Sequence, residues 1–246
     1  MTVPAERPPV PAVVVRLAGG RSVRAVWRND LGGVTFAIGD GGDDGAPVEF
    51  VKTGPGAHAA EAARLAWAGR YVRVPRVLGW DADWLHTAAL AGRSAVDPRW
   101  TAEPLRAARA IGVGLRTLHD AAPVPDCPFD WSVPARLARL RADARRDLAD
   151  PPVVDRLVVC HGDACAPNTL LGDDGSFAGL VDLDSLGVAD RWADLAVATL
   201  SLGWNYGEHR RAEAEAELIG AYGLQPDAIR LDYYRRLWEA PELAPG

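Results

Sequence analysis

Residues 158–171 read VVCHGDACAPNTLL, and no other stretch of the chain says more about its fold. A short apolar run leads into a His-Gly-Asp tripeptide that ends at Asp163, a pattern typical of a buried strand that opens into a polar loop. Asn168 follows Asp163 after five residues, and Asp182 follows fourteen residues later, beyond a turn signal at 172–175. A strand, a loop and a hairpin in this order would bring the three side chains together.

Two carboxylates and an amide in this order fit the chemistry of phosphoryl transfer. A carboxylate beside the attacking hydroxyl orients it and accepts its proton, and oxygen ligands hold Mg²⁺ against the phosphate oxygens. In the protein-kinase catalytic loop an Asp is likewise followed by a metal-binding Asn, and a second metal-binding Asp lies on the next hairpin. We therefore predict that Asp163 is the catalytic residue and that Asn168 and Asp182 bind the metal. Single Asp and Asn residues in loops usually form turns, so the combination carries the prediction.

The composition narrows the class of protein. The 246 residues carry a net charge of −6, which argues against a nucleic-acid partner, since such partners usually meet a basic surface. Three cysteines without a CxxC pair argue against a disulfide framework or a zinc site and fit a reducing compartment. The N-terminal residues lack the long apolar run of a signal peptide or membrane span. We expect a cytoplasmic protein without a membrane partner, and a monomer by default.

The first ninety residues have the pattern of a β-rich region. Residues 12–28 are predicted to form a hairpin that turns at Gly19 and Gly20. A low-complexity loop covers residues 39–46. Further strands are expected at 34–38, 48–52, 77–80 and 84–88, and one helix at 57–68.

After Gly92 the pattern becomes mostly helical. Residues 103–119 form an amphipathic pattern with a proline in the first turn. Further helices are expected at 133–149, 191–204, 209–222 and 226–238, and strands at 158–160 and 177–183. The outline is an α+β protein with a β-rich first lobe and an α-rich second lobe.

The stretch at 158–171, together with GLVDLDSLGVADRWADLAVAT at 179–199, resembles the aminoglycoside phosphotransferase family. The resemblance extends over nearly the whole chain and is dense only around these two segments. It implies a two-lobed protein-kinase-like fold with catalytic hairpins and with ATP and Mg²⁺ as cofactors. Residues 1–91 would form the nucleotide-binding lobe, and residues 92–246 the catalytic and acceptor-binding lobe.

The resemblance also implies how the first lobe would hold ATP. Lys52 would contact the α- and β-phosphates, and Glu61, nine residues later in a helix, would be its ion-pair partner. The loop from Asn29 to Thr35 would cover the phosphates, with glycines that let the backbone approach. The segment 84–89 would meet the adenine ring through backbone groups. The expected nucleotide-binding residues are Lys52, Glu61, Gly32, Gly33, Thr35, Thr87 and Ala89.

Other polar residues are expected to support the site without touching the substrate. His161 would orient the catalytic loop, and Asp190 and Asp194 would hold the loop and the following helix in place. His119 ends a helix, where an imidazole is normally structural. The family more often has glycine at the position of Asp184, so this extra carboxylate is expected beside the metal site or on the surface.

The acceptor site is expected at Asp163 and at two C-terminal segments. In 3′-type enzymes of the family, acidic residues occupy the segment that corresponds to 203–208, where this chain has Asn205, and a position near the C-terminus that Glu239 fits. The chain is also shorter than these enzymes between residues 127 and 161. The segments GWNYGE and YYRRLWE are more similar to streptomycin 3″-phosphotransferases. The expected acceptor-binding residues are Asp163, Trp204, Asn205, Trp238 and Glu239.

These resemblances imply ATP-dependent phosphorylation of an aminoglycoside hydroxyl, with the 3″-hydroxyl of streptomycin favoured. One alternative is a 3′-type kinase for kanamycin or neomycin. Another is a kinase for a different small-molecule alcohol, such as another antibiotic, choline or a sugar. A third is a non-catalytic nucleotide-binding protein of kinase fold.

Overall fold

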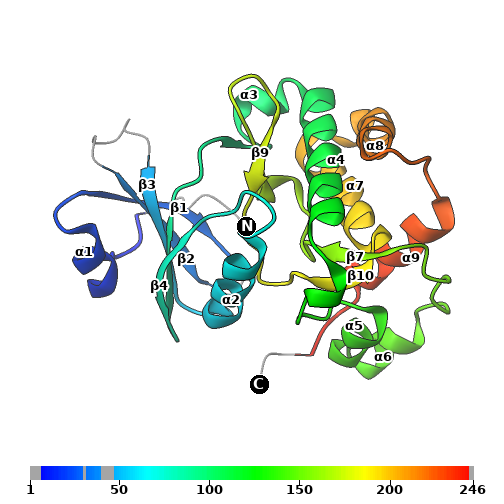
Figure 1. Ribbon diagram of the computed structural model, residues 1–246, viewed down its shortest axis with the longest axis horizontal. Helices are drawn as coiled ribbons and strands as arrows, with labels where there is room; N and C mark the ends of the chain where they lie inside the picture. The colour runs from blue at the N-terminus through cyan, green and yellow to red at the C-terminus, as the bar shows by residue number, and fades with distance from the viewer. Residues whose placement is uncertain (1–6, 30–31, 40–46, 244–246) are drawn as a thin grey trace. The chain divides into compact units, whose positions relative to one another are not determined.

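The computed structural model describes residues 7–29, 32–39 and 47–243. The chain divides into two units, the first made of Met1–Arg70 and Val74–Leu90 and the second of Tyr71–Arg73 and Ala91–Gly246. The larger, five-stranded sheet belongs to the first unit, and most helices belong to the second (Figure 1). The predicted outline of a β-rich first lobe and an α-rich second lobe is therefore confirmed.

The first unit contains a five-stranded antiparallel sheet with the strand order β1-β2-β3-β5-β4. Its strands are β1 (Ser22–Arg28), β2 (Val34–Gly39), β3 (Pro47–Thr53), β4 (Val77–Asp81) and β5 (Trp84–Ala88). The register pairs Thr35 with Lys52, and Lys52 with Leu85. The strands predicted at 34–38, 48–52, 77–80 and 84–88 are confirmed within one residue. The predicted low-complexity loop lies, apart from Gly39, outside the described residues.

The predicted hairpin at residues 12–28 is wrong in its first half, because Ala12–Ala18 form helix α1. Val14 and Ala18, one helical turn apart, are both buried in a cluster with Phe36 of the sheet. This burial outweighs the weak preference of a valine-rich run for a strand. Gly19 ends the helix in the left-handed conformation, with φ of 57°, and its N–H donates to the Val15 carbonyl.

Strand β3 presents two different faces. Val51 is buried in the cluster that contains Val14 of α1. The next residue, Lys52, points to the opposite face, because successive side chains alternate along a strand. On that face helix α2 (His58–Ala68), predicted at 57–68, carries Glu61. Helices α1 and α2 therefore lie on opposite sides of the sheet (Figure 1).

The second unit is built around a bundle of four longer helices, with three shorter ones. The longer helices are α4 (Pro104–Ala121), α7 (Trp192–Tyr206), α8 (Glu208–Tyr222) and α9 (Ala228–Glu239). The shorter ones are α3 (Pro98–Thr101), α5 (Val133–Arg139) and α6 (Ala142–Arg146). Helices α4 and α8 lie side by side (Figure 1), and a Cβ at Gly112 would collide with the Leu218 carbonyl, so glycine permits this approach.

The predicted single helix at 133–149 is wrong, because the chain breaks at Leu140 between α5 and α6. Leu140 has extended backbone, with ψ of 150°, and pairs with Glu242 in an isolated β-bridge. Its side chain is buried in the main core cluster, beside residues of α4 and α7. Insertion of this leucine into the core determines the break, which the arginine-rich sequence around it does not show.

Two small sheets flank the catalytic loop of the second unit. Strand β7 (Leu157–Cys160) pairs with β10 (Gly187–Asp190), and β8 (Thr169–Leu171) lies between β6 (Arg93–Ser94) and β9 (Phe177–Leu180). Strand β9 ends at Leu180, so the predicted strand at 177–183 is too long and Asp182 lies in the following loop. In the ranges that the structure describes, no helix has the length and apolar character to cross a membrane.

Candidate active site

The loop after β7 brings Asp163 and Asn168 together. Asn168 is buried in the 3₁₀ turn η3 (Ala166–Asn168), and its Nδ2 donates to the main-chain oxygen of Asp163 at 2.9 Å. The amide nitrogen of Asn168 therefore shapes the loop. Its Oδ1 is the atom that this arrangement leaves to a cation.

Asp182 is held beside this loop in a strained conformation. Its φ is 63°, the one positive value at a non-glycine position in the described part of the chain, and such strain concentrates at functional sites. The preceding residue, Val181, donates its N–H to the Asn168 carbonyl at 3.0 Å, and its own carbonyl bonds His161 Nε2 at 3.0 Å. The structure thus brings together the three residues whose spacing predicted the site.

Asp163 is half-buried, with its Oδ1 out of contact with solvent, and desolvation raises the pKa of its carboxyl group. The thiol of Cys165 and the ring of His161 act in the opposite direction, while the nearby carboxylates of Asp182 and Asp184 raise the pKa further. Among the described residues, Asp163 Oδ1 has no hydrogen-bond partner. A buried carboxylate oxygen without a partner costs free energy, and it is well suited to receive the proton of a substrate hydroxyl.

The atoms around Asp163 fit a magnesium ion. Asn168 and Asp182 offer oxygen ligands, which Mg²⁺ prefers. A divalent cation held by Asn168 and Asp182 would also offset the repulsion between the carboxylates of Asp163 and Asp182. Asp184 is exposed, and its Oδ1 accepts a hydrogen bond from Ser185 Oγ at 2.9 Å, so it lies on the surface.

Asp194, in the first turn of α7, fixes the start of the catalytic loop. Its Oδ2 accepts from His161 N–H at 2.6 Å, and its Oδ1 from Gly162 N–H at 2.9 Å. His119 Nε2 bonds Oδ2 at 3.0 Å. Burial would raise the pKa of Asp194, but these bonds, led by that of His119, hold it below the ordinary value. The predicted role of Asp194 as a loop anchor agrees with this geometry.

Asp190 has a similar structural position at the end of β10. Its Oδ1 accepts from the N–H of Trp192 at 3.0 Å, and its Oδ2 from the N–H of Asp155 at 2.8 Å. Arg230 lies 3.5 Å from the same Oδ2. These contacts engage both oxygens of Asp190 in holding local backbone, as the sequence predicted.

In the first unit, Lys52 and Glu61 form an ion pair. Lys52 Nζ lies 2.6 Å from Glu61 Oε1. The Glu61 side chain is only 6% exposed, whereas that of Lys52 is 29% exposed. The buried carboxylate therefore fixes the ammonium group while leaving it accessible to a phosphate.

The predicted phosphate loop is partly described. Asn29 N–H donates to the Gly33 carbonyl at 2.9 Å, and Asn29 Oδ1 accepts from Gly33 N–H at 2.6 Å. A Cβ at Gly33 would lie 2.8 Å from Asn29 Nδ2, and Gly32 has φ of 90°, so both positions favour glycine. Residues 30–31 of the predicted loop lie outside the described residues. Thr35 is half-buried on β2.

The predicted adenine-binding segment follows β5. Thr87 is buried and pairs with Phe50 of β3. The N–H of Ala89 donates to the Val48 carbonyl at 2.8 Å. Because this N–H is already bonded, Ala89 would contact adenine through its carbonyl oxygen.

The predicted acceptor residues differ in their surroundings. Trp204 on α7 is 56% exposed, and Glu239 at the end of α9 is exposed. Asn205 uses Nδ2 to donate to the Ser201 carbonyl at 2.8 Å and to Ser201 Oγ at 3.0 Å. Because Ser201 Oγ also accepts from the N–H of Ala166, Asn205 supports the backbone of the catalytic loop.

Sequence reasoning missed Arg136, which is buried beside the predicted acceptor residue Trp238. Its guanidinium carbon lies 4.3 Å from the ring centroid of Trp131 and 5.5 Å from that of Trp238. Burial lowers the pKa of Arg136 to about 10. No local signal separates this arginine from its solvated neighbours in α5, because its aromatic partners come from other segments.

Comparisons with known proteins agree with this geometry. The model of the phosphotransferase enzyme family (APH) matches residues 13–237. An aminoglycoside 3′-phosphotransferase of Streptomyces fradiae is 33% identical over 215 residues, which cover 72% of this chain and 79% of the relative. A streptomycin 3″-kinase of Streptomyces griseus is 33% identical over 254 residues, which cover 84% of this chain and 92% of the relative.

Solved structures show the same likeness. The aminoglycoside phosphotransferase APH(3″)-Id of Streptomyces rimosus superposes with a TM-score of 0.70 at 28% identity, covering 91% of this chain and 94% of that one. Its complex with ADP and streptomycin superposes with a TM-score of 0.65, covering 83% and 88%. These likenesses confirm the predicted resemblance and the α+β kinase-like fold. The chain belongs to the phosphotransferase enzyme family.

Proposed function

We propose that this enzyme transfers the γ-phosphoryl group of ATP to a hydroxyl of an aminoglycoside, with the 3″-hydroxyl of streptomycin as the acceptor. The observation that carries the proposal is the buried Asp163 Oδ1, which has no hydrogen-bond partner among the described residues and lies in the loop that also holds Asn168. Relatives that act on aminoglycosides, one of them a streptomycin 3″-kinase, support the acceptor class.

In the proposed reaction Asp163 orients the acceptor hydroxyl and takes its proton. The acceptor oxygen forms a bond to the γ-phosphorus, the bond from that phosphorus to the β–γ bridging oxygen breaks, and ADP leaves with the electron pair. The raised pKa of Asp163 makes it a stronger base than an ordinary aspartate, which favours proton transfer near neutral pH.

Other residues bind and neutralise the nucleotide. Lys52, fixed by Glu61, would contact the α- and β-phosphates, and Asn168 and Asp182 would hold Mg²⁺. Mg²⁺, when bound, neutralises charge on the phosphate oxygens. We assign nucleotide binding to residues 1–91, including Gly32, Gly33, Thr35, Thr87 and Ala89, and acceptor binding to residues 92–246.

The main alternative acceptor is an aminoglycoside that is phosphorylated at its 3′-hydroxyl. The 3′-phosphotransferase of Streptomyces fradiae is as similar to this chain as the streptomycin 3″-kinase is, although over a smaller share of it. Against the 3′ assignment stands Asn205, which replaces an expected acid and whose amide nitrogen is bonded within α7. Trp204 and Glu239 are exposed and can meet a ring face and a cationic group of the acceptor.

The test measures ADP release with Mg²⁺ and ATP in the presence of streptomycin, kanamycin, neomycin or choline. We expect turnover with streptomycin and a product whose phosphate is on the 3″-oxygen, as located by phosphorus-coupled NMR. Turnover with kanamycin and none with streptomycin would favour the 3′-type candidate. ATP binding without transfer to any acceptor would indicate the non-catalytic alternative.

A further inference from the structure

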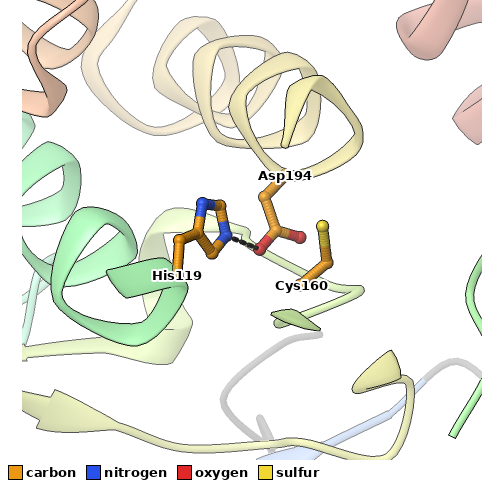
Figure 2. Close-up of side chains that lie close together, drawn as sticks. All are labelled: His119, Cys160 and Asp194. Atoms are coloured by element: carbon orange, nitrogen blue, oxygen red, sulfur yellow. Dashed lines mark hydrogen bonds and ion pairs between the residues drawn. The ribbon is translucent and has the colours of Figure 1, made fainter. Parts of the chain in front are cut away.

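His119, Cys160 and Asp194 form a buried cluster behind the catalytic loop (Figure 2). One atom from each residue lies within 4.8 Å of the others, a composition that could suggest a metal site. These atoms are already engaged, however. Cys160 Sγ donates to the Asp190 carbonyl at 3.4 Å, and burial raises the pKa of Cys160, which disfavours the thiolate that a metal requires.

The cluster instead continues a chain of hydrogen bonds across three helices. His119 on α4 bonds Tyr222 Oη of α8 through Nδ1 at 2.9 Å, and Asp194 of α7 through Nε2 at 3.0 Å. Because ionised Asp194 only accepts, Nε2–H is the donor, and Nδ1 then accepts from the tyrosine hydroxyl. In this neutral tautomer His119 donates to Asp194 and accepts from Tyr222.

This series of hydrogen bonds ends at two backbone N–H groups next to the proposed base, Asp163. Asp194 accepts from the N–H groups of His161 and Gly162, the two residues immediately before Asp163. A Cβ at Gly162, whose φ is 85°, would collide with the Ser185 carbonyl, so the loop has little room to shift. A rotation of the Asp194 carboxylate would be passed directly to Asp163.

We propose that His119 is a positioning residue for phosphoryl transfer, which orients Asp194 and through it holds Asp163 in line with the acceptor hydroxyl. This inference rests on the proposed function, in which Asp163 is the base. It predicts that the loss of His119 slows the chemical step and leaves nucleotide binding unchanged, because Lys52 and Glu61 belong to the other unit.

The first test compares three variants of His119. His119→Leu removes both hydrogen bonds, and we expect kcat to fall about 10- to 100-fold with the KM for ATP unchanged. His119→Gln extends an amide donor toward the position of Nε2 and is expected to keep most of kcat. His119→Asn is equally polar but too short for this bond, and is expected to lose kcat as the leucine variant does. If His119→Leu fails to fold, the glutamine and asparagine variants carry the test.

A second test uses a matched pair of buried tyrosines. Tyr222→Phe removes the hydroxyl that bonds His119, and we expect kcat to fall about 2- to 10-fold. Tyr234→Phe removes a buried hydroxyl that has no partner among the described residues, and is expected to leave kcat unchanged. Equal effects of the two changes on kcat would overturn the proposal.

Hydrogen exchange separates this inference from the proposed function. In His119→Leu the amides of His161 and Gly162 should exchange faster than in the wild type, whatever the acceptor is. Unchanged exchange would show that His119 does not hold the loop. Faster exchange with wild-type kcat would overturn its catalytic relevance. A wild-type enzyme that phosphorylates no acceptor would overturn the proposed function. The exchange rates would then still test whether His119 holds the catalytic loop in place.

Discussion

The catalytic loop and the start of α7 each contain an aspartate with a buried carboxylate oxygen, and the two carboxylates differ in their hydrogen-bond partners and in the direction of their pKa shifts. Asp194 accepts three hydrogen bonds, and its pKa lies below the ordinary value. Asp163 has an oxygen without a hydrogen-bond partner in the described structure, and its pKa is raised. Burial acts in the same direction on both, so the difference comes from the partners.

This difference separates a structural charge from a reactive one. The charge of Asp194 is compensated inside the protein, so it stabilises the folded state. The charge of Asp163 is only partly compensated, by the Cys165 thiol and the His161 ring, so it destabilises the folded state and is available to a substrate hydroxyl. A substitution at Asp163 should therefore lower activity more than stability, and a substitution at Asp194 should lower stability more strongly.

The largest expected effect is on turnover in Asp163→Asn. The amide cannot accept the proton of the acceptor hydroxyl, so kcat should fall about 10²- to 10⁴-fold. Asp173→Asn is the control, because Asp173 is an exposed carboxylate in the turn between β8 and β9 and pairs with Arg99 instead of a residue of the site. Steady-state ADP release measures both. A kcat for Asp163→Asn equal to that of the control would refute the assigned base.

The next largest effect is on stability. Here a substitution at Asp194 should have a larger effect than one at Asp163. Asp194→Asn replaces an acceptor of two backbone N–H groups by an amide, and should lower the free energy of unfolding by about 3–5 kcal/mol. Asp163→Asn removes a charge that is only partly compensated and should leave this free energy unchanged or raise it by about 1 kcal/mol. Urea denaturation measures both. If Asp163→Asn is the more destabilised variant, the contrast drawn between the two carboxylates is wrong.

A third prediction extends the comparison to Glu61, another buried carboxylate whose charge is compensated. Lys52→Ala removes the cation that Glu61 holds, and the KM for ATP should rise roughly 10- to 100-fold, since hydrogen bonds to charged groups have this strength. Arg24→Ala, at an exposed position of β1, is the control. Adding Glu61→Ala to Lys52→Ala should change the KM little further. Additive effects would show that the two residues act separately.

The smallest effect concerns Glu49, a compensated carboxylate of the first unit. Its Oε2 lies 2.8 Å from Arg21 and 2.9 Å from His86, and the hydrogen bond from Arg21 is the main cause that lowers its pKa. A carboxylate with a lowered folded-state pKa stabilises the protein above its unfolded-state pKa, and this stability is lost as the pH falls through the folded value.

Glu49→Gln should therefore cost about 1 kcal/mol at neutral pH, near the upper end for partly exposed ion pairs. The difference from the wild type should disappear in acid, once Glu49 is protonated in both states. Thermal unfolding over a pH series measures it. A difference that persists below the lowered pKa would mean that packing, and not charge, explains the effect.

Much of the candidate site could be predicted from sequence because its members are close in the chain. Asp163, Asn168 and Asp182 lie within one strand–loop–hairpin segment, so their spacing carries most of the geometry. The resemblance to the family likewise implied that Lys52 pairs with Glu61, and the 2.6 Å ion pair agrees with it.

The errors have a common cause, which is packing against distant residues. Helix α1 was predicted as a strand because its burial against Phe36 is invisible in a valine-rich run. The break at Leu140 depends on a bridge to Glu242, about a hundred residues later. The burial of Arg136 depends in part on Trp238, which belongs to α9.

The sequence by itself therefore determined the family, the strands and the helix between residues 34 and 88, and the identity of the three polar residues at the catalytic loop. Only the tertiary structure decided which of the buried carboxylates is compensated. His119 reaches Asp194 across 75 positions of the chain and Tyr222 across 103. Spacing along a chain reports contacts within a segment, whereas the pKa of a buried group depends on partners that only folding brings together.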